Sequence, residues 1–243
     1  MKSEMVNLVI DIGNTQIKTG YFRNGALISE QKFEQWDRCL EALRDQDFER
    51  IIVSTVKGSK KELDAVLPFP YIFFDQNLPL PIKNRYKSPL TLGLDRLAAV
   101  VGGMGFSGSG PLLTVDLGTC ITYDFLNEFQ EYLGGAISPG VNMRAKAMNQ
   151  QTAKLPLVKM PAADISFVGT DTVTCLQSGI YFGVYEEMNG FIARYTSAYP
   201  ELKVFICGGD ANYFESLTKD HIFVIPNLVL YGLDRILMYN VDK

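Results

Sequence analysis

The sequence predicts an α/β protein made of two related domains, and three observations lead to this fold class. The chain has 243 residues, and at about 150 residues per domain this length suits one or two domains. Strand and helix signals alternate along the chain, as an α/β architecture requires. An Asp-x-Gly segment at Asp11 recurs at Asp116, and a repeat at the spacing of a small domain indicates duplication.

The two copies of the repeat share more than this segment. Residues 8–22 and 113–125 each contain a buried-looking strand, then Asp-x-Gly with a nearby threonine, and then a second strand. A glycine-rich stretch at 105–110 lies between the copies. We therefore expect an N-terminal domain at 1–107 and a C-terminal domain at 108–243.

The rest of the first half alternates between helix and strand. Pro79, Pro81 and Pro89 make 77–91 an irregular loop, and loops of this length on a rigid scaffold are often functional. The other expected elements are a helix at 37–47, a strand at 51–53, a helix at 60–67, a strand at 71–74 and a helix from 94 to about 104.

The second half is expected to contain a long helical region at 168–195, a strand at 204–207 and a closing helix at 228–239. The strand breaks into a glycine turn at Gly208 and Gly209. Within the long helical region, some apolar residues offer more surface than the covering of one small domain requires, which predicts a homodimer interface there. These residues are Ile180, Phe182, Val184 and Met188.

Composition excludes several classes of protein. Twenty-three basic and 27 acidic side chains give a net charge of -4, so we expect neither nucleic acid nor an anionic membrane as a partner. The longest weakly polar stretch, 97–106, is about half of a membrane span, and the apolar stretch before Asp11 is too short for a signal peptide. We therefore expect a cytoplasmic protein. Four scattered cysteines and the single His221 indicate neither a zinc site nor a disulfide framework, and one histidine before a strand gives little support to a hydrolase triad.

The glycine turns indicate phosphate chemistry. A strand, a tight glycine turn and a returning strand bring backbone N–H groups and a threonine hydroxyl into a concavity that suits a phosphate. The aspartate in each turn fits a cation held between carboxylate and phosphate, as Mg²⁺ commonly is. One such turn alone is more often an ordinary hairpin. Two copies, with Gly208-Gly209 as a third turn, favour a nucleotide cleft between the domains.

Two other nucleotide-binding motifs are not supported by the sequence. No glycine is followed by lysine, which excludes a Walker A loop. Gly103, Gly105 and Gly108 have the G-x-G-x-x-G spacing but follow a helix and precede a strand, the reverse of a dinucleotide fold. They are interpreted as a helix C-terminal cap. The lysines at 57, 60 and 61 are interpreted as a solvated helix start.

The chain resembles a known family, the type III pantothenate kinases. This family belongs to the actin-like superfamily that includes acetate and sugar kinases and Hsp70. The resemblance covers nearly the whole chain in order. The residues that carry it are Asp11, Gly13, Asn14, Thr15 and Lys18, Tyr86 before Pro89, Gly93-Leu94-Asp95-Arg96, Asp116, Gly118 and Thr119, the run from Gly134 to Gly140, and Thr172 through Gln177-Ser178-Gly179.

The resemblance implies duplicated actin-like, ribonuclease H-like ATPase domains that phosphorylate pantothenate with ATP in the first step of coenzyme A synthesis. Asp116 is implied to bind a monovalent cation, K⁺ or NH₄⁺, and Asp95 to accept the proton. Thr172 is implied to reach the other subunit of a dimer. The implied ATP-binding residues are Asp11, Ile12, Gly13, Asn14, Thr15, Gln16, Ile17, Lys18 and Thr119, and the implied pantothenate-binding residues are Tyr86, Gly93, Leu94, Asp95, Arg96 and Thr172.

Chemistry from the residues agrees with this, because phosphoryl transfer needs in-line positioning, cations and a proton acceptor. Arg96 has the planar fork that suits a carboxylate such as that of pantothenate. Without the phosphate turns, Asp95-Arg96 would be interpreted as a helix cap and ion pair. Two alternatives stay open: another small-molecule kinase of the superfamily, which should lack the Tyr86 and Gly93–Arg96 combination, and a nucleotide-dependent regulatory protein, which a basic face or appended segment would support.

Overall fold

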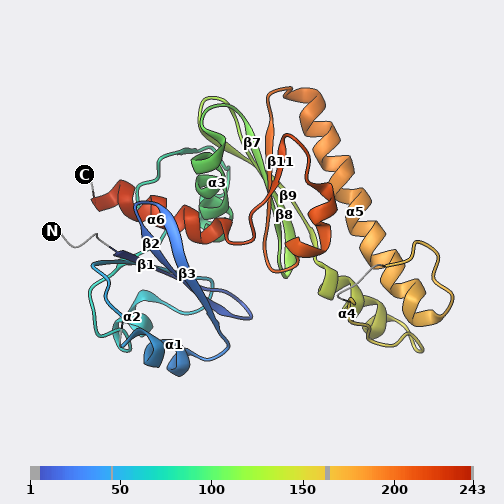
Figure 1. Ribbon diagram of the computed structural model, residues 1–243, viewed down its shortest axis with the longest axis horizontal. Coiled ribbons are helices and arrows are strands. Elements are labelled where there is room, and N and C mark those ends of the chain that lie inside the picture. Colours follow the sequence, from blue (N-terminus) through green and yellow to red (C-terminus); the bar gives the residue numbers. More distant parts are fainter. Residues whose placement is uncertain (1–5, 45, 162–164, 242–243) are drawn as a thin grey trace. The chain divides into compact units, whose positions relative to one another are not determined.

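The computed structural model describes residues 6–44, 46–161 and 165–241, and it divides into two compact units (Figure 1). Unit 1 comprises Met1–Ser109, Gln130–Leu133 and Asn227–Lys243, and unit 2 comprises Gly110–Phe129 and Gly134–Pro226. The first junction lies two residues beyond the expected boundary. The two units are not simply consecutive, however, because the end of the chain returns to unit 1.

Unit 1 is built on a five-stranded sheet in the order β3-β2-β1-β4-β5. The central strand β1 pairs antiparallel with β2 and parallel with β4. Both β1 and β4 carry buried apolar residues on each face, as strands covered on both sides do. The strands are β1 (Val6–Ile12), β2 (Ile17–Arg23), β3 (Ala26–Phe33), β4 (Arg50–Thr55) and β5 (Ile72–Phe73).

Glycines bring two helices of unit 1 into close contact. A Cβ at Gly102 would collide with the Leu228 carbonyl oxygen, and one at Gly232 would collide with that of Ala98. The helix that carries Gly102 was expected to end near residue 104 but continues to Ser107, and Gly108, with φ of 73°, caps it as expected. This contact holds the C-terminal helix in unit 1. The helices are α1 (Trp36–Leu43), α2 (Lys60–Asp64), the short 3-10 helix η1 (Pro89–Thr91), α3 (Leu94–Ser107) and α6 (Leu228–Val241).

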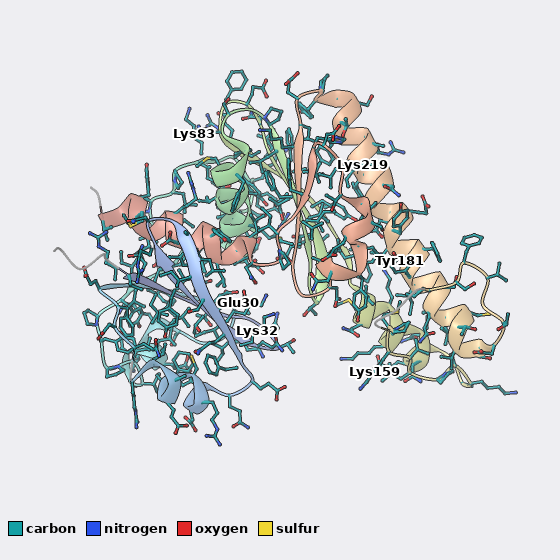
Figure 2. The ribbon with its side chains drawn as sticks, in the orientation of Figure 1. Glu30, Lys32, Lys83, Lys159, Tyr181 and Lys219 are labelled. Atoms are coloured by element: carbon teal, nitrogen blue, oxygen red, sulfur yellow. The ribbon has the colours of Figure 1, made fainter. Side chains whose placement is uncertain are left out.

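The edge strand β3 was not expected from the sequence, because half of its residues are polar and most are exposed. Glu30 and Lys32 project from it (Figure 2) and form an ion pair of 3.6 Å. Charged side chains on an exposed edge discourage pairing with a further strand. The strand is therefore specified by the β2 hairpin and not by an apolar pattern of its own.

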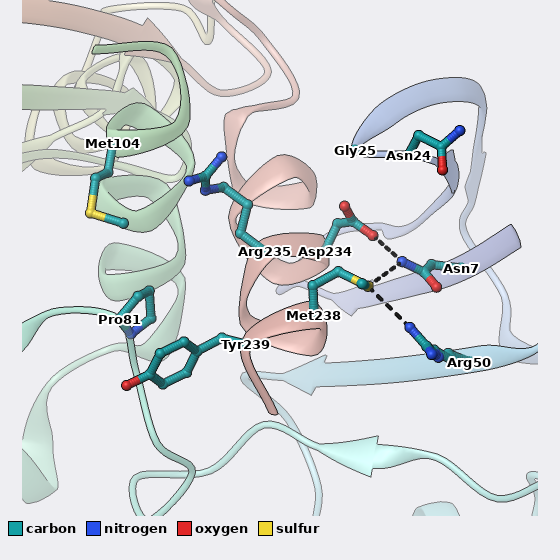
Figure 3. A pocket seen from close by; sticks show the side chains of 10 residues that line it. All are labelled: Asn7, Asn24, Gly25, Arg50, Pro81, Met104, Asp234, Arg235, Met238 and Tyr239. Atoms are coloured by element: carbon teal, nitrogen blue, oxygen red, sulfur yellow. Dashed lines mark hydrogen bonds between the residues drawn. The ribbon is translucent and has the colours of Figure 1, made fainter. Parts of the chain in front are cut away.

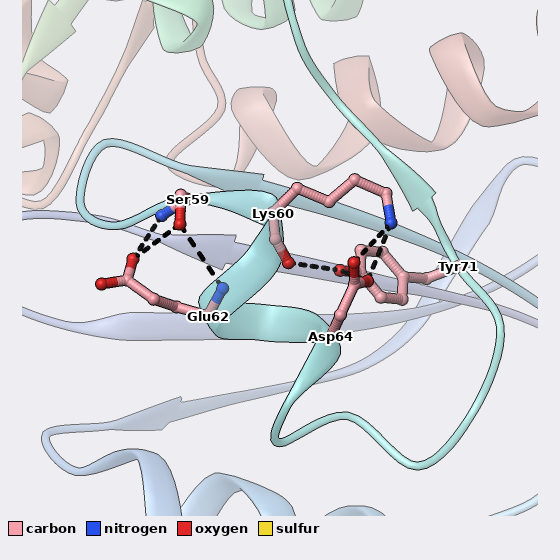
Figure 4. A network of polar contacts seen from close by, with 5 residues as sticks. All are labelled: Ser59, Lys60, Glu62, Asp64 and Tyr71. Carbon is pink, nitrogen blue, oxygen red and sulfur yellow. Dashed lines mark hydrogen bonds and ion pairs between the residues drawn. The ribbon is translucent and has the colours of Figure 1, made fainter.

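The short helix α2 shows what the neighbouring lysines do (Figure 4). The Ser59 side chain and the Glu62 side chain form a capping box at its start. Asp64 binds both Lys60, at 2.8 Å, and the Tyr71 hydroxyl, at 2.7 Å. The solvated helix start predicted for this cluster is confirmed for Lys60. The helix ends at Asp64, before the expected residue 67, and Pro68 disfavours helical backbone at residue 67 itself.

Unit 2 repeats the strand order of unit 1. Its strands follow the order β9-β8-β7-β10-β11, which matches β3-β2-β1-β4-β5 position by position. The central β7 pairs antiparallel with β8 and parallel with β10. The internal repeat seen in the sequence is therefore a duplication of topology. The strands are β7 (Leu112–Leu117), β8 (Cys120–Leu126), β9 (Glu131–Pro139), whose first residues belong to unit 1, β10 (Lys203–Cys207) and β11 (Ile222–Val224).

The long helix α5 (Thr172–Ala198) runs along the sheet of unit 2 (Figure 1). Ile180, Val184 and Met188 are at most 2% exposed and belong to the core of the unit. We expected these residues to leave apolar surface for a dimer interface. The structure corrects this expectation at these three positions, because the chain's own sheet covers them. The other helices of unit 2 are α4 (Val141–Gln151) and the 3-10 segment η2 (Ala211–Leu217). Among the described residues, no helix is long and apolar enough to cross a membrane.

Candidate active site

Asp11 lies near the end of the central strand of unit 1, between two polar neighbours. In the sheet register it faces Lys18 on β2 and Ser54 on β4. Burial of the carboxyl group raises the pKa of Asp11 to about 6, and the negative charge of Asp95 adds to the rise. The positive charge of Lys18 and the Ser54 hydroxyl oppose it. The carboxylate is therefore held where a cation would stabilise its charged form.

The turn after Asp11 is closed by its own backbone. The Gly13 N–H donates to the Gln16 carbonyl at 3.0 Å, and Asn14, Thr15 and Gln16 are exposed. The side chain of Lys57, from the segment after β4, donates to the Asn14 carbonyl. An exposed turn that is held by such hydrogen bonds can present its N–H and hydroxyl groups to an anion.

Asp95 lies in the first turn of α3, two residues after the N-cap residue Gly93. Its Oδ1 accepts the Arg96 N–H at 2.9 Å, which is a contact within the first turn, whereas no side-chain hydrogen bond caps the helix at Gly93. A Cβ at Gly93 would lie only 2.5 Å from that oxygen, so glycine leaves room for the carboxylate. The same carboxylate is close enough to Asp11 for its charge to raise the pKa there.

Arg96, the residue after this aspartate, packs against the Tyr86 ring. The side chain is 7% exposed, and its Cζ lies 5.7 Å from the centre of the Tyr86 ring. The Tyr86 ring in turn lies 6.1 Å from that of Tyr132. A guanidinium held over an aromatic face keeps its planar fork oriented. The arrangement suits recognition of a carboxylate.

Strand pairing, an ion pair and a hydrogen bond hold the loop that carries Tyr86. Its short strand β6 (Lys83–Asn84) pairs in parallel with Glu131 and Tyr132 of β9, and Arg85 forms an ion pair of 2.8 Å with Glu131. The Tyr86 N–H donates to Asn84 Oδ1 at 2.9 Å. The proline-rich loop is therefore held mainly by its contacts with β9.

Asp116 occupies in unit 2 the place that Asp11 has in unit 1. It lies near the end of β7 and faces Thr122 on β8 and Cys207 on β10. The Gly118 N–H donates to the Cys120 carbonyl at 3.1 Å, which closes this turn as Gly13 closes the first. Thr119 is exposed at the tip.

The glycine turn after β10 lies against Asp116. Gly208 has a φ of 97°, and a Cβ there would collide with Asp116 Oδ1 and lie 2.5 Å from the Leu117 carbonyl oxygen. The Asp210 N–H donates to that carbonyl at 3.0 Å. Burial raises the pKa of Asp210. The third turn predicted from the sequence is therefore in contact with the second.

A helix start that sequence reasoning missed joins these turns. Gly140 caps the N-terminus of α4, and its N–H donates to the Thr119 carbonyl at 3.2 Å. A Cβ at Gly140 would collide with the Gly118 carbonyl oxygen. The positive end of a helix dipole beside a glycine turn favours an anion.

Thr172 lies elsewhere in unit 2, at the first position of α5, where it is exposed. The preceding Asp171 caps the helix, and its carboxylate accepts the Thr174 N–H at 3.0 Å. Thr172 is therefore on a well-formed helix start. Unit 1 brings together Asp11, Lys18 and Asp95, with Tyr86 next to Arg96, whereas unit 2 brings Asp116 close to the Thr119 turn.

Sequence reasoning gave no site role to Ser54, Lys57, Tyr132 or Gly140. The first three reach the site through strand pairing or loop contacts across long sequence separations, which no local pattern reports. Gly140 had a signal, since it ends a glycine-rich run directly before a helix.

Comparison with known proteins identifies relatives over nearly the whole chain. The family profile for type III pantothenate kinases matches residues 7–194. A type III pantothenate kinase from Bacteroides fragilis is 41% identical over 97% of this chain and 98% of its own. One from Cytophaga hutchinsonii is 38% identical over 97% of this chain and 100% of its own.

Solved structures share the fold. A protein described as a Baf family transcriptional activator, from Campylobacter jejuni, has a TM-score of 0.66 and 22% identity over 97% of this chain and 100% of its own. A ROK family glucokinase from Streptomyces griseus has a TM-score of 0.52 and 12% identity over 96% and 99% of the two chains. At these identities the likeness concerns the fold alone. It confirms the predicted fold class of duplicated actin-like, ribonuclease H-like domains.

Proposed function

The chain belongs to the type III pantothenate kinase family, and from this premise we propose how its residues divide the work of phosphoryl transfer. The reaction is the ATP-dependent phosphorylation of pantothenate to 4'-phosphopantothenate, the first step of coenzyme A biosynthesis. The observation that carries the assignment of residues is the grouping of Asp11, Lys18 and Asp95 on unit 1.

ATP binds through its phosphates to the turn from Asp11 to Lys18 of unit 1, and Thr119, on the equivalent turn of unit 2, is a further proposed ATP-binding residue. Exposed N–H and hydroxyl groups at Asn14 and Thr15 and the charge of Lys18 support this role. A divalent cation, Mg²⁺, fits beside Asp11, because a bound cation would stabilise a carboxylate whose pKa burial has raised. When bound, such a cation would neutralise charge that develops on the transferred group.

Pantothenate binds beside the start of α3. Arg96, oriented by the Tyr86 ring, binds the carboxylate, and Gly93 and Leu94 supply backbone around it. Asp95 then accepts the proton of the 4'-hydroxyl as that oxygen attacks the γ-phosphorus. The proton goes to the Asp95 carboxylate, and ADP leaves with the electrons of the broken phosphorus–oxygen bond.

Asp116 is the proposed ligand of a monovalent cation, K⁺ or NH₄⁺. The donor set fits, because the carboxylate lies in a cradle that a side chain at residue 208 would fill, next to the Leu117 carbonyl. Asp116 and backbone oxygens of these turns would hold the ion. When bound, it would supply positive charge beside this turn.

The protein works as a homodimer in the cytoplasm, with Thr172 contributed by a second copy of the chain. The surface around Thr172 supports an interface, because Phe167, Val168 and Val173 are 74%, 68% and 41% exposed. Exposed apolar groups of this kind are covered in stable assemblies. The buried face of α5 has no part in this proposal.

A coupled assay of ADP release tests the proposal. The protein is given ATP, Mg²⁺ and, in turn, pantothenate, glycerol, acetate and glucose, in KCl or NaCl of equal ionic strength. We expect turnover with pantothenate in KCl and much less in NaCl. Turnover with another acceptor in place of pantothenate would assign a different kinase activity, and equal rates in both salts would remove the role of Asp116.

A further inference from the structure

A partly buried carboxylate on α5 joins four elements of unit 2. Glu187 Oε1 accepts the Tyr123 hydroxyl of β8 at 2.9 Å and also the Ser138 hydroxyl near the end of β9. Its Oε2 accepts a guanidinium N–H of Arg144 on α4, and the two side chains form an ion pair. Each of these charged side chains is 22% exposed, so solvent screens the pair less than it screens a surface pair.

The contacts of Glu187 stabilise its charged form. Burial acts to raise the pKa of Glu187, but the hydrogen bonds from Ser138, Arg144 and Tyr123 outweigh burial and hold the pKa below its usual value. Burial and the charge of Glu187 raise the pKa of Tyr123, so the tyrosine stays a hydrogen-bond donor. At neutral pH, Glu187 is therefore an anion that hydrogen-bond donors from three other elements surround.

Arg144 extends these contacts to the start of α4. Its Nη2 binds Glu187, and its Nε donates to the Pro139 carbonyl at 2.9 Å. Pro139 directly precedes Gly140, the N-cap residue of α4. The Arg144 N–H also donates to the Gly140 carbonyl at 3.0 Å. The planar guanidinium fork therefore fixes the peptide at which β9 passes into α4.

The start of α4 packs directly on the turn that carries Thr119. The Gly140 N–H donates to the Thr119 carbonyl at 3.2 Å, and a Cβ at Gly140 would lie only 2.6 Å from the same oxygen. A shift of Gly140 would therefore also shift the Thr119 backbone. Contacts run without a gap from Glu187 through Arg144 and Gly140 to this turn.

Unit 1 contains a polar cluster that is suited to a different role. Asn7 donates to Asp234 of α6 at 2.7 Å and to the sulfur of Met238 at 3.3 Å (Figure 3). Asn7 lies at the start of β1, whereas Asp11 lies near the other end of that strand. These contacts bind α6 to the sheet. Their loss should lower stability without a direct effect on a phosphate turn.

We propose that Glu187 is a positioning residue for ATP, because through Arg144 it holds the start of α4 against the Thr119 turn. The inference rests on the ATP-binding role proposed above for Thr119. Glu187 acts through other residues and does not itself touch a substrate. The pantothenate-binding residues proposed above lie mainly on unit 1, so loss of the Glu187 charge should affect ATP more than pantothenate.

The proposal is tested with the full chain in Mg²⁺ and KCl, well below the unfolding temperature of each variant. Titration with a non-hydrolysable ATP analogue gives the Kd, and steady-state kinetics gives a KM for each substrate. Glu187→Gln removes the charge at nearly constant size, and Arg144→Lys keeps the charge without the fork that reaches Pro139. The controls are Glu186→Gln, at an exposed position of the same helix, and Asn7→Ala in unit 1.

We expect Glu187→Gln and Arg144→Lys each to raise the Kd for the analogue and the KM for ATP at least about tenfold, because a small misplacement of a binding group can be this costly. The KM for pantothenate should change little. The double variant should lose no more affinity than the weaker single variant, because both changes break one bridge. Glu186→Gln should match the wild type, and Asn7→Ala should unfold at a lower temperature with an unchanged Kd.

Arg144 is partly exposed, so Arg144→Lys should fold even if Glu187→Gln does not. Unchanged ATP affinity in either folded variant would overturn the inference, and so would an equal loss for both substrates or a similar loss in Asn7→Ala. In these cases wild-type turnover would leave the proposed function intact. A wild-type protein that neither binds the analogue nor phosphorylates pantothenate would overturn the proposed function together with the inference.

Discussion

The charge of Asp95, at the start of α3, raises the pKa of Asp11, near the end of β1. The two carboxylates are therefore electrostatically coupled within one unit. Burial is the larger cause of the raised pKa at Asp11. Two neighbouring carboxylates in different surroundings are a common way for an active site to give one group an acid–base role and the other a cation-binding role.

The pKa of Asp11 predicts how stability depends on pH. A carboxyl group with a pKa near 3.8 when unfolded and about 6 when folded binds more protons in the folded state between these values. Stability should therefore fall as pH rises from about 4 to 6, by up to about 3 kcal/mol for a shift of this size. Urea unfolding of the protein without Mg²⁺ or ATP, at a series of pH values, measures this dependence of the free energy of unfolding on pH.

Asp11→Asn removes this group and should flatten that part of the stability curve. The variant should be more stable than the wild type at pH 7.5 and nearly inactive. Asp47→Asn, at an exposed position, is the control and should retain the wild-type slope. An Asp11→Asn curve that keeps the full slope would show that another group is responsible.

We predict that alanine substitution has different effects at Gly208 and at its neighbour Gly209. Gly208→Ala places a Cβ against Asp116 at a φ of 97°, whereas nothing lies within 4 Å of a Cβ at Gly209. Backbone strain alone should lower the free energy of unfolding by about 1–3 kcal/mol. Displacement of Asp116 should also lower the rate in KCl. Thermal unfolding and kinase rates measure both effects, and Gly209→Ala should be close to wild type in each. Equal effects of the two substitutions would contradict the role of the close approach.

Arg96 predicts a specific loss of pantothenate affinity. Arg96→Lys keeps the charge but loses the planar fork above Tyr86. The KM for pantothenate should rise about tenfold, which corresponds to about 1.4 kcal/mol, and the KM for ATP should change little. Steady-state kinetics with each substrate varied in turn measures the two values, with circular dichroism as the check of folding. A rise in the KM for ATP instead would indicate that Arg96 binds the nucleotide and not pantothenate.

The repeat could be predicted from the sequence because each half contains a buried strand, a glycine turn and a returning strand within about 15 residues. The structure confirms the consequence, since Asp11 and Asp116 hold equivalent register positions. By contrast, the polar edge strand β3 has no regular alternation, and α4 has few buried residues. Both depend on tertiary contacts that local patterns do not contain.

The site was predictable where motif residues are close in sequence, as at Asp11–Lys18 and Gly93–Arg96. Ser54, Lys57 and Tyr132 could not be found in this way, because strand pairing or loop contacts bring them to the site. The return of the C-terminal helix to unit 1 was missed for a similar reason. Gly102 and Gly232 permit the close helix contact, but glycines inside an apolar stretch do not identify their partner in the sequence.

Asp95→Asn tests the proton acceptor. The amide keeps the shape of the side chain but does not accept the proton, and positioned general bases contribute about 10² to 10⁴ in rate. The kcat should fall by an amount in this range while ATP affinity changes little. Rapid-quench kinetics and nucleotide titration measure the two quantities. Near-normal turnover combined with early thermal unfolding would show that Asp95 only caps α3.

The identity of the product tests the central claim most directly. The protein is incubated with pantothenate, ATP, Mg²⁺ and KCl, and the products are analysed by mass spectrometry and by ³¹P NMR with coupling to neighbouring protons. The account predicts one new species with the mass of phosphopantothenate, in which the phosphorus couples to the two protons of the 4'-carbon. Intact pantothenate after full incubation, or a phosphoryl group attached at another position, would contradict it.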